Sequence, residues 1–417
     1  MSDDGGACVG ARYTAICACP DARPLPLSGR SVIPYILVII KGKPRYRPHR
    51  SSYYCIDTLN RYSRAATARS YRRRPMNTLT RRRFLQTASV ATLAAAGGFS
   101  RAVRAQPVVT LRCSSSMPAD QNAAHYVWYE RLAANLKASV GDAIRVDYFP
   151  NSQLGKESDV AQQVKIGAID MMIAGSSIWA TVAPELGMLD LGYLFDSYTH
   201  VAKALDGPVG ASLNALLQKR AGCTVLTWGS HFGGRCVFTK KPVLALQGLQ
   251  GTKLRVLPTP AFMDTFKAMG AVPTPIPFGE LYMAVQTGVV DGLEHDPATV
   301  LASKFDEVVK SCWQSQHVFA AMTVVMGRRA LARIPANLRP AFDRAVADAT
   351  VQQRAIAAQK AEQAEQTLRR HGMTFHPIAD AERAALRQTM HDRLYVPFAK
   401  QYAATAPLFP AIAAARS

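Results

Sequence analysis

The chain has 417 residues, with 50 Lys/Arg against 29 Asp/Glu and a formal net charge of +21. This length allows two or more domains, and so basic a chain first suggests a nucleic-acid binder. However, residues 1–105 carry 19 basic and 4 acidic residues, a net +15, whereas the other 312 residues carry 31 and 25, a net +6. The charge pattern therefore argues against nucleic-acid binding by the bulk of the chain.

Residues 76–105 have the composition of an export signal. Three arginines (81–83) precede an apolar run, Ala88–Phe99, and small residues precede Ala105 as a signal peptidase requires. The segment Thr80–Leu85 resembles the twin-arginine export signal. The alternative, a basic amphipathic helix, is disfavoured because the run has no polar face, and the run is too short to span a bilayer. We expect cleavage after Ala105 and a periplasmic mature chain.

Residues 1–75 lie upstream of a signal that should itself be N-terminal, and they are rich in Arg, Pro and Ser. We expect them to be a disordered extension, or the product of a wrongly assigned start codon with Met76 as the true start. Four of the eight cysteines lie there. The remaining cysteines have no metal-binding spacing, so we expect buried thiols, although one disulfide remains open; these are Cys113, Cys223, Cys236 and Cys312.

From residue 107 onward, apolar strands alternate with amphipathic helices. The pattern predicts an α/β lobe with a mostly parallel sheet, and no glycine-rich phosphate loop follows any strand. Nucleotide binding is therefore not supported. The expected strands are 107–116, 143–150, 169–177 and 223–230, and the expected helices are 122–141, 156–168 and 200–222.

A second lobe is expected from Gly233. An apolar strand is expected at 316–327. A helix of about 35 residues, roughly 50 Å long, is expected after it at 335–372. Two lobes with a crevice between them are the usual frame of a small-ligand site. The expected strands of this lobe are 235–240, 251–259 and 289–295, and its expected helices are 260–270 and 279–288.

Two arginines are candidates for binding a carboxylate. Arg235 follows two glycines at the start of a strand, and Arg255 lies within a strand between Leu254 and Val256. A planar guanidinium fits a carboxylate with two parallel hydrogen bonds. The alternative for either arginine is an internal ion pair or a solvated sheet edge.

Several segments, in this order, resemble the solute-binding proteins of tripartite ATP-independent periplasmic (TRAP) transporters. The similarity runs from about Val109 to the C-terminus, and the mature chain is identified as a member of this family. The segments are "FPNSQLGKESDVAQQVKIGAIDMMIAG", "LDLGYLFDSYTHVAKALDG", "LQGLQGTKLRV", "MGAVPTPIPFGELYMAVQTGVVDGLEH" and the long helix after Arg329.

The resemblance implies an α/β, two-lobed periplasmic-binding-protein-like fold, with a ligand cleft between the lobes and a long helix spanning both. Lobe I would comprise 106–232 plus about 321–360, and lobe II 233–320 plus about 361–417. Such a receptor captures a small organic acid and delivers it to membrane permease subunits. We expect a monomer that is not an enzyme, uses no cofactor and binds no nucleic acid.

The resemblance also implies roles for residues of the second lobe. Arg255 would pair with the ligand carboxylate, Arg235 would assist it, and Phe278 would pack on the ligand, with plain core packing as its alternative. His295 stands where the family often has asparagine, so a bulkier, titratable donor would adjoin the carboxylate.

Polar residues near the ends of first-lobe strands are further candidates. Trp179 is the one aromatic among them, and it is equally well explained as a core residue. The candidates are Ser115, Ser116, His125, Ser176, Ser177 and Trp179.

The stretch "VVDGLEHDP" holds three carboxylates in nine residues. We expect Asp291 to fix a turn, and Glu294 to face the crevice. Neighbours in a strand point to opposite faces, so this stretch cannot by itself hold a metal. The alternative function is an exported hydrolase or lyase that uses Glu294 and His295 as acid and base, but no GxSxG, HExxH or CxxC motif accompanies them. Aromatic acids, 2-oxo acids, dicarboxylates and sugar acids all remain open as ligands.

Overall fold

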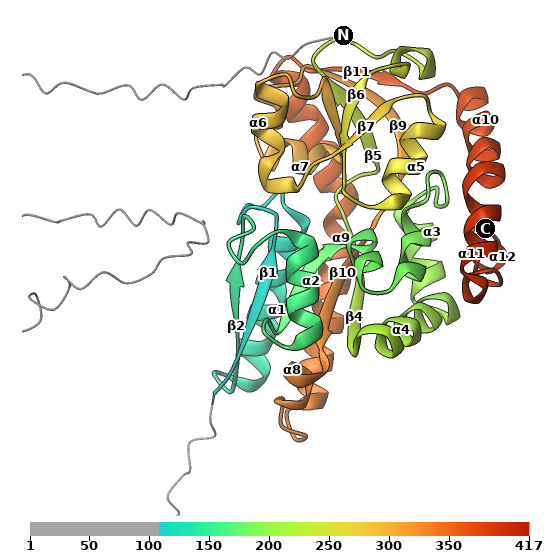
Figure 1. Cartoon of the computed structure of the whole chain (residues 1–417). Helices are drawn as coiled ribbons and strands as arrows, with labels where there is room; N and C mark the ends of the chain where they lie inside the picture. Colours follow the sequence, from blue (N-terminus) through green and yellow to red (C-terminus); the bar gives the residue numbers. More distant parts are fainter. Residues whose placement is uncertain (1–107, 417) are drawn as a thin grey trace, which may run out of the picture. The chain divides into compact units, whose positions relative to one another are not determined.

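The computed structural model describes residues 108–416, so the expected extension and the export signal lie outside the described residues. The first of two sheets has the strand order β2-β1-β3-β10-β4 (Figure 1). β1 is parallel to β2 and β3, whereas β10 is antiparallel to β3 and β4, so the sheet is mixed. Its strands are β1 (Val109–Ser115), β2 (Ile144–Phe149), β3 (Met171–Gly175), β4 (Cys223–Ser230) and β10 (Ala321–Gly327).

The second sheet has the order β11-β9-β5-β8-β6-β7. β5 is antiparallel to β8 and β9, and β6 is parallel to β7 and β8. Its strands are β5 (Arg235–Thr239), β6 (Lys253–Val256), β7 (Val272–Pro275), β8 (Gly292–His295), β9 (Ser311–Val318) and β11 (Thr374–Pro377).

The expected single strand at 316–327 is wrong. Its first residues end β9 in the second sheet, and the chain crosses at residues 319–320 to begin β10 in the first sheet. Because the residues on both sides of the crossing, 318–322, are apolar and buried, hydrophobicity alone does not reveal the break.

Helices cover the sheets, and several begin at residues suited to that position. Ser197 accepts a hydrogen bond from His200 N at 3.1 Å, and Asp296 accepts one from Thr299 N at 2.9 Å, which satisfies otherwise unpaired N–H groups. The helices before the long one are α1 (Ala124–Val140), α2 (Glu157–Ile166), α3 (Tyr198–Leu205), α4 (Pro208–Ala221), α5 (Pro260–Ala268), α6 (Leu281–Gln286), α7 (Pro297–Ala302) and α8 (Arg328–Ala332). Short 3₁₀ helices include η1 (Ser176–Thr181), η2 (Pro184–Asp190) and η4 (Phe278–Glu280).

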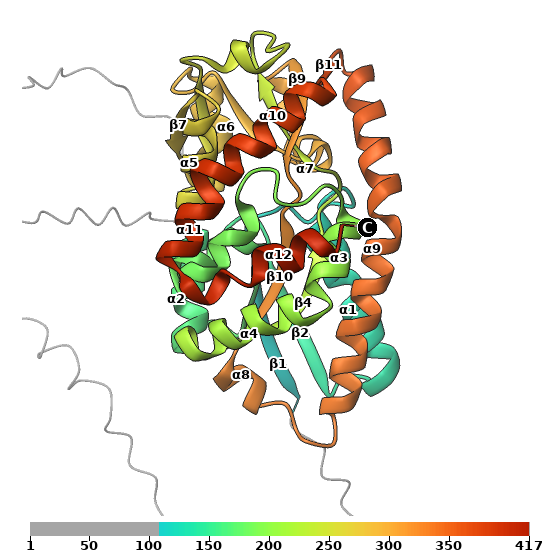
Figure 2. The ribbon, with the colours of Figure 1, turned by 90° about the vertical axis from the view of Figure 1, so that its right-hand side faces the viewer.

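The long helix α9 (Arg339–Arg370) has 32 residues, close to the expected length. It packs against α1 and β4 of the first lobe and against α7, which follows β8 of the second (Figure 2). Its buried face is built largely from small residues such as Ala345, Ala349 and Ala364. This helix therefore spans the two lobes, as the resemblance implied.

The C-terminal helices are α10 (Asp380–Met390), α11 (Val396–Gln401) and α12 (Leu408–Ala414). α10 packs on α5, whereas α12 packs on α4, and Ile412 O lies 2.7 Å from His200 Nε2 (Figure 2). The expectation that residues 361–417 belong wholly to the second lobe therefore does not hold for α12. The amphipathic pattern of this segment predicts which face of each helix is buried, but it does not identify the element against which that face packs.

A glycine pair positions Arg235 where the chain crosses from β4 to β5. Gly233 has φ +113°, a region that side chains rarely adopt, and an added Cβ would lie 3.2 Å from Pro297 Cδ and 3.4 Å from Ala361 Cβ. The connection thus passes closely between α7 and α9.

Within residues 108–416, no helix combines the length and apolar character needed to cross a bilayer. The four cysteines in this part of the chain are buried free thiols, as expected.

Candidate functional site

Arg255 lies on β6, between β7 and β8, and its side chain is fully buried. Its Nε donates to Ile276 O at 2.8 Å, while Nη1 and Nη2 are buried with no hydrogen-bond partner among residues 108–416. Burial lowers the pKa of Arg255 to about 10, so the group is still a cation at neutral pH. Two adjacent unpaired N–H donors with a positive charge are the groups that bind a carboxylate in bidentate fashion.

Arg235 is paired internally. Its Nε lies 2.5 Å from Glu294 Oε2, and its Nη2 donates to Glu294 Oε1 at 2.9 Å and to Glu294 O at 3.1 Å. The pair forms because β5 is antiparallel to β8 and places Val237 opposite Glu294. Phe262 lies under the guanidinium, 5.0 Å from its carbon to the ring centroid. Arg235 thus forms an ion pair, the alternative left open for it, and its expected contact with the ligand stays a prediction.

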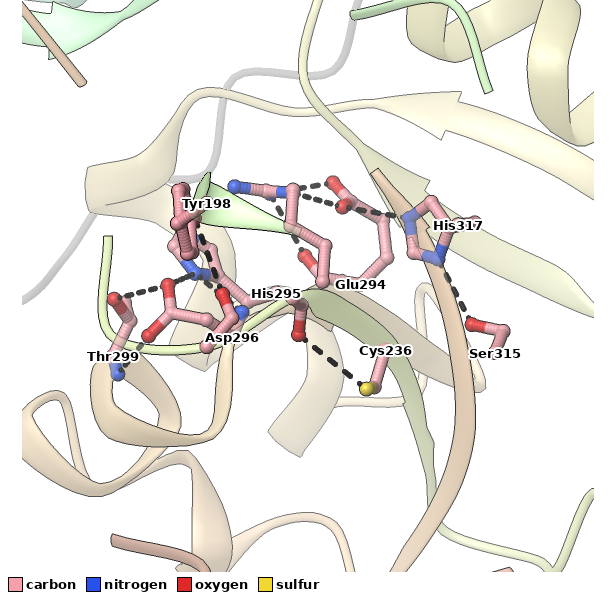
Figure 3. Close-up of polar contacts among 11 residues, drawn as sticks. Tyr198, Cys236, Glu294, His295, Asp296, Thr299, Ser315 and His317 are labelled. Atoms are coloured by element: carbon pink, nitrogen blue, oxygen red, sulfur yellow. Dashed lines mark hydrogen bonds and ion pairs between the residues drawn. The ribbon is translucent and has the colours of Figure 1, made fainter. Parts of the chain in front are cut away.

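Glu294 is likewise engaged with the protein. Besides Arg235, it faces His317, whose Nε2 is 3.4 Å from Oε2 and whose Nδ1 is 2.9 Å from Ser315 Oγ (Figure 3). Burial opposes ionisation of Glu294, but Arg235 and His317 outweigh it and lower its pKa to about 2. Glu294 therefore stays an anion. Neither the expected ligand contact nor the role of general acid or base fits it.

His295 is buried beside Arg255 and makes a local contact with Asp296. Its Nδ1 is 2.8 Å from Asp296 Oδ2. The other carboxylate oxygen of Asp296 accepts a hydrogen bond from Thr299 N and so caps the start of α7 (Figure 3). Burial, followed by the charge of Arg235, lowers the pKa of His295 well below its usual range. The ring is therefore neutral, and a cationic histidine beside the ligand carboxylate is not supported.

Phe278 is half-buried on η4 and contacts both His295 and Arg255. Its ring centroid lies 5.7 Å from that of His295 and 6.0 Å from the guanidinium carbon of Arg255. A second edge contact, with Phe305 at 5.7 Å, fixes the ring from the other side. Phe278 thus lies beside the unpaired guanidinium and presents apolar area there.

First-lobe residues approach the same place from the ends of β1 and the starts of α1 and α2. Ser115 Oγ is 2.9 Å from His125 Nδ1, and Ser116 Oγ donates to Glu157 Oε1 at 2.9 Å. Burial raises the pKa of Glu157, and the nearby charge of Arg255 lowers it by a smaller amount. Ser115 and Ser116 therefore position neighbouring side chains, and Glu157, which was not among the expected site residues, lies near Arg255.

The other first-lobe candidates have internal roles. Ser176 Oγ donates to Asp190 Oδ2 at 2.6 Å, and Ser177 is buried and supports the same carboxylate through its backbone. Trp179 is fully buried in the main hydrophobic core. These three residues therefore have internal positions, and their expected ligand contacts stay predictions. η1 begins directly after β3, so its serines turn toward η2.

Sequence reasoning missed His231, which lies one residue beyond β4 in the connection to β5. Both ring nitrogens are buried without a hydrogen-bond partner in the described part of the chain. The ring centroid is 5.4 Å from that of His125 and 6.5 Å from that of His295. The feature of the sequence that could have identified His231 is its position four residues before Arg235, in a connection that crosses between the lobes.

The stretch around β8 is otherwise structural. Asp291 Oδ2 accepts a hydrogen bond from Lys253 N at 2.9 Å, so its role is structural, as expected, but it joins the chain to the start of β6 and does not fix a local turn. Residues 108–416 contain no group of three or more His, Cys, Asp or Glu side chains placed to hold a metal ion.

Comparisons with known proteins agree with this architecture. The model of the family "Bacterial extracellular solute-binding protein, family 7" matches residues 114–401. The C4-dicarboxylate-binding periplasmic protein DctP of Rhodobacter capsulatus is 28% identical over 257 residues, which are 60% of this chain and 77% of that protein.

Two solved structures of TRAP periplasmic solute-binding proteins have the same fold. One, from Polaromonas sp. JS666 and bound to D-erythronate, has a TM-score of 0.67 and 27% identity, over 74% of this chain and 98% of that one. The other, from Sulfurospirillum deleyianum with bound succinate, has a TM-score of 0.68 and 26% identity, over 73% of this chain and 98% of that one.

Proposed function

Because this chain belongs to the bacterial extracellular solute-binding proteins of family 7, we propose that it is a periplasmic receptor for a small organic acid. It delivers the acid to the membrane permease subunits of a TRAP transporter, which drive uptake with an ion gradient. The family consists of binding proteins of transport, so no bond of the ligand is broken. The observation that carries the proposal is the buried, unpaired guanidinium edge of Arg255.

A carboxylate is the ligand group that fits Arg255. An unpaired buried charge is costly, and an anion that accepts hydrogen bonds from both Nη atoms removes that cost. Phe278 packs against the carbon skeleton, and His295 and His125 contact its polar groups. Ser115 and Ser116 orient His125 and Glu157, while the Arg235–Glu294 pair holds β5 against β8 behind the ligand.

The proposed lobes are residues 106–232 with about 321–360, and residues 233–320 with about 361–417, with α12 returning to the first. The site draws residues from both, so hinge closure over the ligand would form it. The arginine cluster and apolar run of residues 76–105 support export by the twin-arginine route, with cleavage after Ala105 and a monomeric receptor in the periplasm.

Calorimetry and thermal-shift measurements across an organic-acid library test the proposal. Saturable binding of at least one acid, with no product after prolonged incubation, is expected. The Arg255→Met variant should lose that binding, because Met keeps the apolar volume and removes the charge. Conversion of a bound acid into product, or an unchanged affinity in the variant, would overturn the proposal.

A further inference from the structure

Two buried histidines near Arg255 have ring nitrogens without partners. His125 Nε2 and both nitrogens of His231 make no hydrogen bond within residues 108–416, although the two side chains are only 1% and 3% exposed. A buried polar group without a partner is destabilising, so such groups are few in folded proteins. Other unpaired atoms, such as Trp313 Nε1, stand singly in the core, whereas these nitrogens lie together, with ring centroids 5.4 Å apart.

The hydrogen-bond network assigns the proton on His125. Met117 N donates to Ser115 Oγ at 3.0 Å, so the single hydroxyl proton of Ser115 is free to be donated to His125 Nδ1, 2.9 Å away. In this arrangement Nδ1 accepts, and the proton of the neutral imidazole is on Nε2, which has no partner within residues 108–416. His125 then offers a donor, and neutral His231 offers one donor and one acceptor.

A continuous series of ring contacts connects these histidines to Arg255. The ring centroid of His231 is 6.5 Å from that of His295, and that of His295 is 5.7 Å from that of Phe278. The Phe278 centroid is in turn 6.0 Å from the guanidinium carbon of Arg255. His295 and Phe278 therefore lie between the unpaired cation and the unpaired histidines, the arrangement that one ligand with a polar group at each end would bridge.

The charges at the two ends of this series differ. Arg255 is a cation, whereas burial lowers the pKa of His125 to about 3 and that of His231 well below its usual range. The Asp296 carboxylate also acts electrostatically on His231. The Arg235 cation also acts on His231, but it is already paired with Glu294. A second carboxylate of a ligand would meet neutral rings and a nearby anion at this end, so its desolvation would be compensated less than at Arg255. A hydroxyl or carbonyl oxygen carries no such penalty.

We propose that His125 and His231 recognise a neutral hydroxyl or carbonyl group on the ligand whose carboxylate binds Arg255, so that the receptor takes hydroxy or oxo monocarboxylates in preference to dicarboxylates. This inference rests on the proposed function and narrows its ligand class. The histidines supply specificity, and Arg255 supplies affinity for the shared carboxylate.

Matched acids of equal chain length test the inference by calorimetry. At four carbons the set is D-erythronate, 2-oxobutyrate, succinate and butyrate, and hydroxy acids and dicarboxylates of five and six carbons extend it. A hydroxy or oxo acid should bind at least about 10-fold more tightly than the dicarboxylate of its length, since an unpaired buried group costs roughly a factor of 10 to 100. Tighter binding of the dicarboxylates would refute the inference while leaving a carboxylate receptor. Failure of every acid to bind would contradict the proposed function itself.

The His231→Leu variant tests the residue assignment. We expect a loss of roughly 10- to 100-fold in affinity for the preferred hydroxy or oxo acid, and little change for the aliphatic acid of the same length. The His231→Asn variant, which keeps a neutral donor and acceptor, is the matched control and should retain most of the affinity. Equal losses for both acids in the Leu variant would reduce His231 to a structural residue and overturn its role.

Discussion

Replacing Arg255 by methionine should remove acid binding without destabilising the ligand-free protein. The pKa of this fully buried group falls from 12.5 to about 10, which corresponds to about 3 kcal/mol against the charged form in the folded state. The substitution removes that penalty, but it also leaves Ile276 O without the Nε donor, which costs about 1–2 kcal/mol. The net expectation is an unfolding free energy between the wild-type value and about 2 kcal/mol above it.

Chemical denaturation and thermal shift, each with and without a binding acid, measure both parts of this prediction. The acid should stabilise the wild type by an amount that rises with its concentration, as expected for a ligand that binds only the native state. The Arg255→Met variant should show no such rise. A variant that remains responsive to the acid, or that loses several kcal/mol of stability when ligand-free, would refute the reasoning that Arg255 lacks an internal partner.

Three further changes separate internal pairs from the ligand site. Arg235→Met leaves the buried Glu294 carboxylate with His317 but without its guanidinium partner, so it should lower the unfolding free energy by about 3–5 kcal/mol, and denaturation that matches wild type would contradict the pairing. His125 is neutral in the folded protein, with a pKa of about 3, so the unfolding free energy falls as pH falls below about 6.5. His125→Asn should flatten this dependence of the unfolding free energy on pH by up to about 1.4 kcal/mol per pH unit. An unaltered slope would contradict the prediction. Burial raises the pKa of Asp190 to about 7, so the unfolding free energy falls as pH rises from about 4 to 7. Asp190→Asn should add up to about 4 kcal/mol at pH 8 and little at pH 4, whereas equal effects at both would exclude the titration.

The two arginines show how far sequence reasoning reaches. Both lie in strands with apolar neighbours, and both gave the same two alternatives, a ligand carboxylate or an internal partner. Only the strand order decides between them, because β5 lies beside β8 and brings Arg235 to Glu294, whereas β6 places Arg255 Nε at Ile276 O and leaves its Nη atoms unpaired. A strand pairing between segments nearly sixty residues apart is not encoded in local pattern.

Local signals were more reliable for elements than for side-chain roles. The long helix and the two sheets follow from periodicity, and the structure bears them out. Ser176 and His231, in contrast, both follow first-lobe strands. Ser176 donates a hydrogen bond to Asp190, whereas both ring nitrogens of His231 have no partner within residues 108–416. The direction in which a side chain leaves a strand end depends on the packing of the next segment, which lies far along the chain.

The different pairing of the two arginines gives each a different part in binding. The Arg235–Glu294 pair satisfies itself within one sheet, so its energy is the same whether or not a ligand is bound. Burial of Arg255 carries a free-energy cost that an anion accepting its two free donors would offset, so a bound carboxylate would favour the arrangement in which Arg255 is buried. A ligand can shift a conformational equilibrium only by its differential affinity for the two states. Under the proposed function, Arg255 would be the residue through which the acid stabilises closed lobes, and a permease that accepts only the closed form would respond to the loaded receptor.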